Sequence, residues 1–134
     1  MMRPAIAALM LWAGLLGLLY LALALNVVRH RYRAKVGIGD GGDPALARAV
    51  RAHGNFAEYV PLVLVLLLLL AIAGWGSLHL HIMGGILFVA RLGHGIGLSM
   101  SEGPSVGRGV GMLGTWGVLA AASVMVIWTA AAVP

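Results

Sequence analysis

The chain has no cysteine among its 134 residues. It can therefore form no disulfide, and any thiol chemistry would have to use a thiol that a substrate brings in. Charge is scarce as well, since only 10% of the residues are Asp, Glu, Lys or Arg, against about 25% in a typical soluble domain. Acids are scarcest, with 4 in the chain. This poverty of charge argues against an ordinary soluble domain.

Apolar residues fill the chain instead, at 61% of the sequence. A soluble chain of this length could not bury so much apolar side chain, so its solvent must largely be lipid. The formal net charge is +5, and 6 of the 9 Lys and Arg residues lie between Arg29 and Arg51, in the region that separates two apolar segments. A cytoplasmic loop that obeys the positive-inside rule explains this cluster. No nucleic-acid partner is expected.

Four segments are long enough to cross a bilayer, which takes about 20 mostly apolar residues in a helix. They cover residues 4–28, 44–73, 78–98 and 106–133. The second is long enough only if its helix begins at Pro44 with Asp43 as the N-cap. We therefore predict an all-α fold, a single integral membrane domain built as a four-helix bundle. A signal peptide cleaved near residues 22–24 is the alternative for the first segment, although the Arg and Lys residues that follow favour a stop-transfer pattern.

The basic loop also predicts the topology. With that loop in the cytoplasm, four spans leave both termini on the non-cytoplasmic side. The connection at residues 101–105 then returns to the cytoplasm, so Arg108 lies on the same side as Arg51.

Other conspicuous residues point to packing rather than chemistry. The pair His79 and His81 has a spacing that could suit a metal, but no third ligand is evident, so no metal site is expected. Several glycines are expected to let helices approach closely. They are Gly84, Gly85, Gly107, Gly109 and Gly111.

Polar side chains form one face of the helix expected at 44–73. Drawn at about 100° per residue, they fall within an arc of roughly 100°. They are Arg48, Arg51, Asn55, Glu58 and Tyr59. His53 projects to the other side. Charge inside a membrane helix must be paired or must bind something. The face is therefore either a ligand site or an Arg–Glu–Asn network that holds helices together.

The other segments bring cations to the same side of the membrane. Arg29 lies at the end of the first, Arg91 and His94 lie three residues apart on the third, and Arg108 opens the fourth. Several arginines suit a ligand with more than one carboxylate, because each guanidinium can bind a carboxylate through two hydrogen bonds.

Glu58 is the single acid within the membrane segments, and it suits an ammonium group on the same ligand. Its partner within the protein could be Arg51, seven residues away, or Arg91 on another helix. Glutathione, with two carboxylates, one ammonium and one thiol, fits this set of charges, as other amphoteric metabolites would.

The run from Arg51 to Pro61, Arg-Ala-His-Gly-Asn-Phe-Ala-Glu-Tyr-Val-Pro, resembles the signature of the MAPEG family, the membrane-associated proteins of eicosanoid and glutathione metabolism. Residues 36–44 and 90–99 resemble its bacterial branch. The resemblance covers nearly the whole chain. It implies a homotrimer in the bacterial inner membrane, with glutathione as co-substrate held between subunits near the cytoplasmic face.

Binding roles follow from the same resemblance. Arg51 and Asn55 match positions that hold glutathione, and Glu58 matches the acid that meets its amino group. Tyr59 follows that acid, as in some members, and supplies a phenol.

Four residues outside this run also match. Arg29 corresponds to the basic residue that closes the first helix, and Arg91 and His94 to the polar pair of the third. Arg108 matches the arginine to which thiolate stabilisation is ascribed in active members, and it is the predicted catalytic residue.

Two positions depart from the family pattern. Gly54 stands where some members have a further ligand-binding Arg, and Leu98 where several have a ligand-binding Tyr. The resemblance implies a glutathione transferase or peroxidase that acts on lipophilic substrates. The alternative is a non-catalytic membrane protein that binds lipid or glutathione. A small multidrug exporter would need an acid in its first span, and residues 1–28 contain none.

Overall fold

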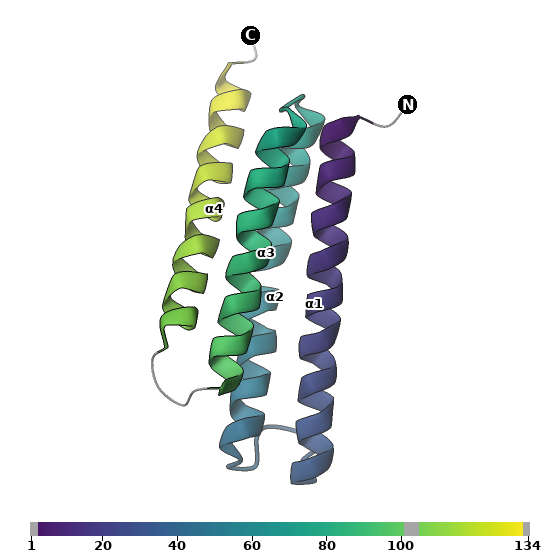
Figure 1. The fold of residues 1–134 in the computed structure, drawn as a ribbon, viewed down its shortest axis with the longest axis vertical. Coiled ribbons are helices and arrows are strands. Elements are labelled where there is room, and N and C mark those ends of the chain that lie inside the picture. The colour runs from purple at the N-terminus through teal and green to yellow at the C-terminus, as the bar shows by residue number, and fades with distance from the viewer. Residues whose placement is uncertain (1–2, 101–104, 133–134) are drawn as a thin grey trace.

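The computed structural model describes residues 3–100 and 105–132. These residues form four helices and no strand (Figure 1): α1 (Pro4–Ala34), α2 (Pro44–Ile72), α3 (Ser77–Met100) and α4 (Val106–Ala131). Each helix is long and apolar enough to cross a membrane. The predicted all-α, four-helix membrane fold is confirmed.

The start of α2 follows from the sequence as predicted. The Asp43 side chain accepts hydrogen bonds from the backbone N–H groups of Ala45, at 2.8 Å, and Leu46, at 3.0 Å. Pro44 occupies the first helical position, where its missing N–H costs nothing. The helix therefore begins with polar residues before it reaches its apolar half.

The helix α1 extends beyond the predicted membrane span of residues 4–28. The helix continues past Val28 to Ala34 and stops at Lys35, which adopts a left-handed conformation with φ 54°. Charged residues after Val28 do not by themselves end a helix. The apolar segment therefore ends at the membrane boundary near Val28, whereas the helix continues to Ala34. At 31 residues and about 1.5 Å each, α1 is roughly 46 Å long, whereas the hydrocarbon core is about 30 Å thick. At α4, the helix ends at Ala131, and predicted residue 133 lies outside the described residues.

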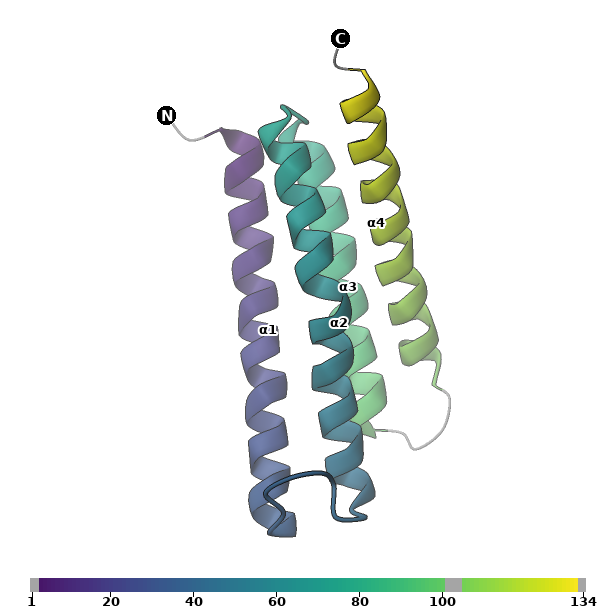
Figure 2. The ribbon, with the colours of Figure 1, turned by 180° about the vertical axis from the view of Figure 1, so that it is seen from behind.

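The two middle helices, α2 and α3, form the centre of the bundle. α1 packs against both on one side and α4 packs against both on the other, and no described residue of α1 contacts α4 (Figures 1 and 2). Leu16, Val63 and Leu87 lie fully enclosed where α1, α2 and α3 meet. The outer faces expose large apolar side chains such as Leu18 and Ile127, which suits contact with lipid.

Glycines allow α3 and α4 to pack closely, as predicted for Gly107 and Gly111. A Cβ at Gly107 would come within 3.1 Å of the Gly93 carbonyl oxygen, and one at Gly111 would crowd His94. The prediction is wrong for Gly109, because nothing lies within 4 Å of the Cβ it would carry.

Gly84 and Gly85 also permit close packing, but of a side chain. Both accept the ring of Trp12 from α1. The small residues therefore bring α1 against α3 through an aromatic ring, and bring α4 against α3 through direct backbone approach.

One end of the bundle gathers the residues of the predicted site. The connection from α1 to α2 and the start of α4 lie at this end, whereas the turn between α2 and α3 and the start of α1 lie at the other (Figure 1). Arg108 is therefore at the same end as Arg51, as the predicted topology requires.

Candidate functional site

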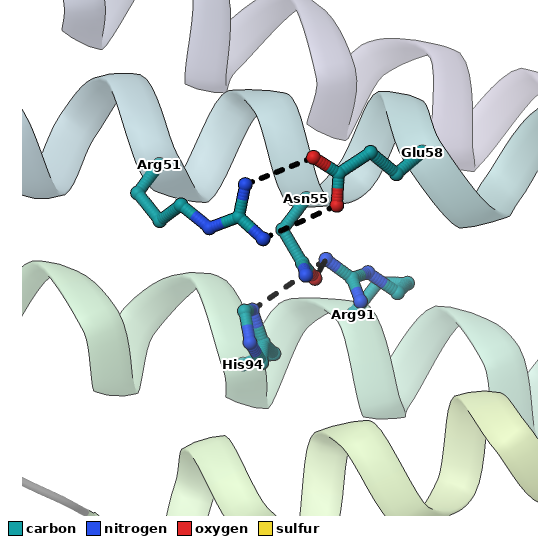
Figure 3. Close-up of polar contacts among 5 residues, drawn as sticks. All are labelled: Arg51, Asn55, Glu58, Arg91 and His94. Carbon is teal, nitrogen blue, oxygen red and sulfur yellow. Dashed lines mark hydrogen bonds and ion pairs between the residues drawn. The ribbon is translucent and has the colours of Figure 1, made fainter.

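An exposed ion pair lies on the polar face of α2. The guanidinium of Arg51 donates two hydrogen bonds to the carboxylate of Glu58, at 2.8 and 3.2 Å (Figure 3). Their side chains are 60% and 49% exposed. The residues stand two turns apart, and the long arginine side chain spans that distance along the helix. Of the two candidate partners for Glu58, the structure selects Arg51.

Beneath this pair lies a buried polar cluster of Asn55, Arg91 and His94 (Figure 3). Arg91 is only 1% exposed, and its Nη2 donates a hydrogen bond of 2.8 Å to the Asn55 side-chain oxygen. The same nitrogen lies 3.5 Å from Nδ1 of His94. Arg91 makes no direct ion pair with Glu58 among the described residues, because its guanidinium is enclosed between α2 and α3 at the level of Asn55, although the Glu58 carboxylate still acts on it electrostatically.

The groups that touch the Arg91 side chain directly are neutral. Its guanidinium carbon lies 5.6 Å from the centre of the Phe56 ring, a cation–π contact, and Nη1 lies 3.8 Å from the Met112 sulfur. Among the described residues, its Nε has no hydrogen-bond partner. Burying a charge is costly, and the Glu58 carboxylate favours this cation electrostatically without an ion pair to it among the described residues. Phe56 and Met112 were not anticipated from the sequence, because projecting only polar residues ignores the apolar groups that surround a cation.

The polar face thus has two layers with different roles. The inner cluster joins α2 to α3 through Arg91 and Asn55 and holds the Asn55 amide in one orientation. The outer pair, Arg51 and Glu58, makes no such bridge between helices and remains open to the surroundings. The two interpretations of the face, a network that pins helices and a ligand site, apply to different residues of it.

Arg108 brings α4 to the same place. Ser105 caps α4 by accepting a hydrogen bond of 3.3 Å from the Arg108 backbone N–H. A Cβ at Gly97 would lie 3.3 Å from the Arg108 side chain, so the first turn of α4 rests directly on α3. The charges of Arg51, Arg91 and Arg108 all act on the His94 ring. Cations from three helices therefore converge around one histidine.

The remaining predicted residues are less closely integrated. Tyr59 is half-buried on α2. Arg29 is exposed on α1, outside the cluster formed by α2, α3 and α4. His53 points away from the face, as predicted, and stacks on Tyr20 of α1 with ring centres 4.6 Å apart.

The two departures from the family pattern differ in their surroundings. Leu98 is 4% exposed and belongs to the apolar core. Gly54 faces open space, with nothing within 4 Å of the Cβ it would carry. In residues 3–100 and 105–132, no three or more His, Asp or Glu side chains gather in a way that could hold a metal ion.

Fold and site together define a four-helix membrane protein with an arginine-rich polar site at one end of its bundle. The family model named MAPEG family matches residues 9–128, which include parts of all four helices. The chain belongs to the MAPEG family.

The chain is also similar to two curated relatives. Both are named Inner membrane protein YecN, one from Escherichia coli strain K12 and one from Escherichia coli O6:H1 strain CFT073. Each is 38% identical to the chain over 84 residues, which cover 63% of this chain and 64% of the relative. The matched region therefore spans slightly less than two thirds of the relatives' length.

Proposed function

We propose that the chain binds glutathione at the Arg51–Glu58 pair and activates its thiol towards lipophilic electrophiles or hydroperoxides. The observation that carries the proposal is the exposed ion pair of Arg51 and Glu58, which is joined by two hydrogen bonds. It lies above the buried hydrogen bond from Arg91 to Asn55, and the charge of Arg108 acts on the neighbouring His94. Membership of the MAPEG family supports the same ligand.

The charges of the pair match those of the ligand. A carboxylate of glutathione can replace Glu58 on the Arg51 guanidinium, and the ammonium group can then pair with the Glu58 carboxylate. This exchange keeps both protein charges neutralised, which favours an amphoteric ligand over a simple anion. The buried bond from Arg91 leaves Asn55 in a fixed position beside the pair.

Arg108 supplies the activation in this proposal. A free thiol has a pKa of about 8.5, and a neighbouring cation lowers it. The glutathione thiolate would then form a carbon–sulfur bond with the electrophile while the leaving group departs. The protein contributes proximity and charge stabilisation, since it has no cysteine to act as a covalent nucleophile.

Calorimetric titration of the purified protein in detergent tests the binding step. We expect saturable heat with glutathione, loss of that heat in Arg51→Gln, and retention in Arg33→Gln, which removes an exposed cation from α1. Absence of wild-type binding at millimolar glutathione would contradict the proposal.

Conjugation of chlorodinitrobenzene tests the activation step. Arg108→Ala should lower kcat by roughly 100-fold, the loss expected when one charge-stabilising group is removed. The thiolate absorbance of bound glutathione should also titrate at higher pH in this variant. Unchanged kcat and an unchanged thiolate titration would exclude the role of Arg108.

A second function, glutathione or lipid binding without turnover, is favoured by Leu98 and Gly54. Leu98 is buried and has no hydroxyl to offer, and Gly54 offers no cation. The open space at Gly54 allows a direct comparison. Gly54→Arg should fold and tighten glutathione binding. If wild type binds but conjugates nothing, and Gly54→Arg also conjugates nothing, the non-catalytic function is correct.

The assembly and location belong to the same proposal. A homotrimer would place the exposed pair against a neighbouring subunit, whose Arg29 could reach a shared ligand. The relatives' name supports the bacterial inner membrane. With the basic loop in the cytoplasm, both termini would lie on the non-cytoplasmic side. Mass measurement of the intact detergent complex tests the trimer.

A further inference from the structure

A separate groove runs between α1 and α3, on the opposite side of α3 from the seam with α4. Its volume is about 330 Å³, at the lower end of the range of about 300 to 1,000 Å³ for small-ligand sites. α1 and α3 line it with Leu19, Ala22, Leu23, Asn26, His30, Leu92, Gly95 and Ile96. None of these residues belongs to the Arg51–Glu58 pair or to the buried cluster beneath it.

The polarity of the groove changes along α1. Leu19, Ala22 and Leu23 form its inner part, followed by Asn26 and then His30. These residues lie within an arc of roughly 100° on α1, and Leu19 to His30 spans about 16 Å of helix axis. On α3, the side chain of Ile96 is 51% exposed, so the groove opens outward towards the surrounding lipid.

The polar end of the groove is rich in cations, and the nearby carboxylate of Asp43 interacts electrostatically with His30. His30 is followed by Arg31, Arg33 and Lys35, and residues 1–39 contain no acid. Arg31 donates hydrogen bonds to the Gly37 and Gly39 carbonyl oxygens and is committed to the loop. Arg33, seven residues from Asn26, lies on the groove side of α1 and is exposed.

The geometry points to a binding site for an anionic phospholipid in this groove. One acyl chain lies along Leu19 to Leu23, the ester region meets Asn26, and the phosphate meets His30 and Arg33. The order of apolar, polar and cationic groups along α1 is the order of chemical groups along such a lipid. Cations near a membrane surface each contribute roughly a five-fold preference for anionic lipid. The site is independent of glutathione binding.

Native mass spectrometry of the detergent-purified protein tests this site. The protein is mixed with equal amounts of phosphatidylglycerol and phosphatidylcholine that carry the same acyl chains. We expect wild type to retain phosphatidylglycerol at least about five-fold in excess. The double variant His30→Gln and Arg33→Gln should bring the ratio close to one while still binding some lipid of both kinds.

Filling the groove provides the second arm. A Cβ at Gly95 would meet Leu23 at 3.5 Å, an ordinary contact, so Gly95→Leu should fold and block the acyl chain. Ala22→Phe blocks the same groove from α1 if the first variant fails to fold. Gly117→Leu, at an open position on α4, is the matched control and should retain wild-type binding.

Three results would overturn the inference. The first is an equal response to the two lipids in the wild type. The second is full phosphatidylglycerol retention in folded Gly95→Leu or Ala22→Phe protein. The third is displacement of bound phosphatidylglycerol by inorganic phosphate alone, which would indicate a site for a free anion. If a second copy of the chain covers the groove instead, the filling variants would change the oligomer mass and leave lipid retention unchanged.

Discussion

Arg91 carries its charge at the centre of the contact between α2 and α3, where the groups that touch it directly are neutral and the Glu58 carboxylate acts on it electrostatically. Its hydrogen bond to Asn55 and its position over the Phe56 ring offset part of the cost of burial. Because so few groups stabilise this charge, removing one of them should lower the free energy of unfolding more than removing any exposed charge would. The Arg51–Glu58 pair, in contrast, lies open on the surface of α2.

The buried pair can be tested by a double-mutant cycle. Asn55→Leu should destabilise the fold by roughly 3–5 kcal/mol, because it leaves the Arg91 charge without its principal acceptor. Adding Arg91→Met should recover most of that loss, since two apolar side chains replace both polar partners. Unfolding in mixed micelles measures the free energies.

Glu58→Gln is the control for this cycle. It weakens an exposed pair and should change stability by about 0–1 kcal/mol. If the effects of Asn55→Leu and Arg91→Met simply add, the two residues are not coupled and the proposed role of Arg91 in anchoring Asn55 is wrong.

At the scale of the element, the seam between α3 and α4 depends on residues without side chains. Gly111→Leu should force the helices apart and cost roughly 1–3 kcal/mol, because its Cβ would meet backbone of Ala90 and the side chain of His94. Gly117→Leu on the same helix meets nothing within 4 Å and should be neutral or slightly stabilising. Thermal unfolding in detergent compares the two variants. Equal melting temperatures would show that close approach at Gly111 does not stabilise the contact between α3 and α4.

The start of α2 should depend on pH. The hydrogen bond from the Leu46 N–H is the largest influence that lowers the pKa of Asp43 below its usual value of 3.8. A lowered folded-state pKa means that the cap is complete above about pH 3.8 and is lost as the pH falls through the lower, folded value. The amide resonances of Ala45 and Leu46 in detergent should titrate with a midpoint below 3.8.

Asp43→Asn is the control, because Asn caps helices as well as Asp does but has no proton to gain. Its two amide resonances should not shift over the same range. A wild-type midpoint at or above 3.8 would show that the cap does not favour the ionised carboxylate.

At the scale of the whole molecule, the absence of cysteine makes the topology directly measurable. We expect Ile38→Cys, in the basic loop, to react with a membrane-impermeant maleimide only after the cells are permeabilised. Gly76→Cys, in the turn between α2 and α3, should react in intact cells. The native chain provides a background without reaction, and the reverse pattern would show that the basic loop is outside.

The sequence predicts the helices well because each leaves a local signal. The length of the apolar segments predicts the four helices, and Asp43 followed by Pro44 predicts where α2 begins. The angular placement of Arg51, Asn55 and Glu58 on one face also follows from helix geometry alone.

Partner choice could not be predicted in the same way. Whether Glu58 meets Arg51 or Arg91 depends on how α3 is rotated and how deep it lies against α2, and neither leaves a local signal. The same applies to the enclosure of Arg91 by Phe56 and Met112. The end of the α1 helix at Ala34 could not be predicted for a different reason, since hydropathy reports the membrane boundary and a helix can continue beyond it.

The arrangement of α4 has a consequence for how the protein is made. Among the described residues α1 meets only α2 and α3, and α4 makes no contact with α1. The first three helices can therefore pack into a unit before α4 joins them. α4 would then dock last, along its glycine seam, and bring Arg108 beside His94 only at that step. A released chain that ends before residue 106 should already resist protease within α1 to α3, but its polar site would lack one of its cations.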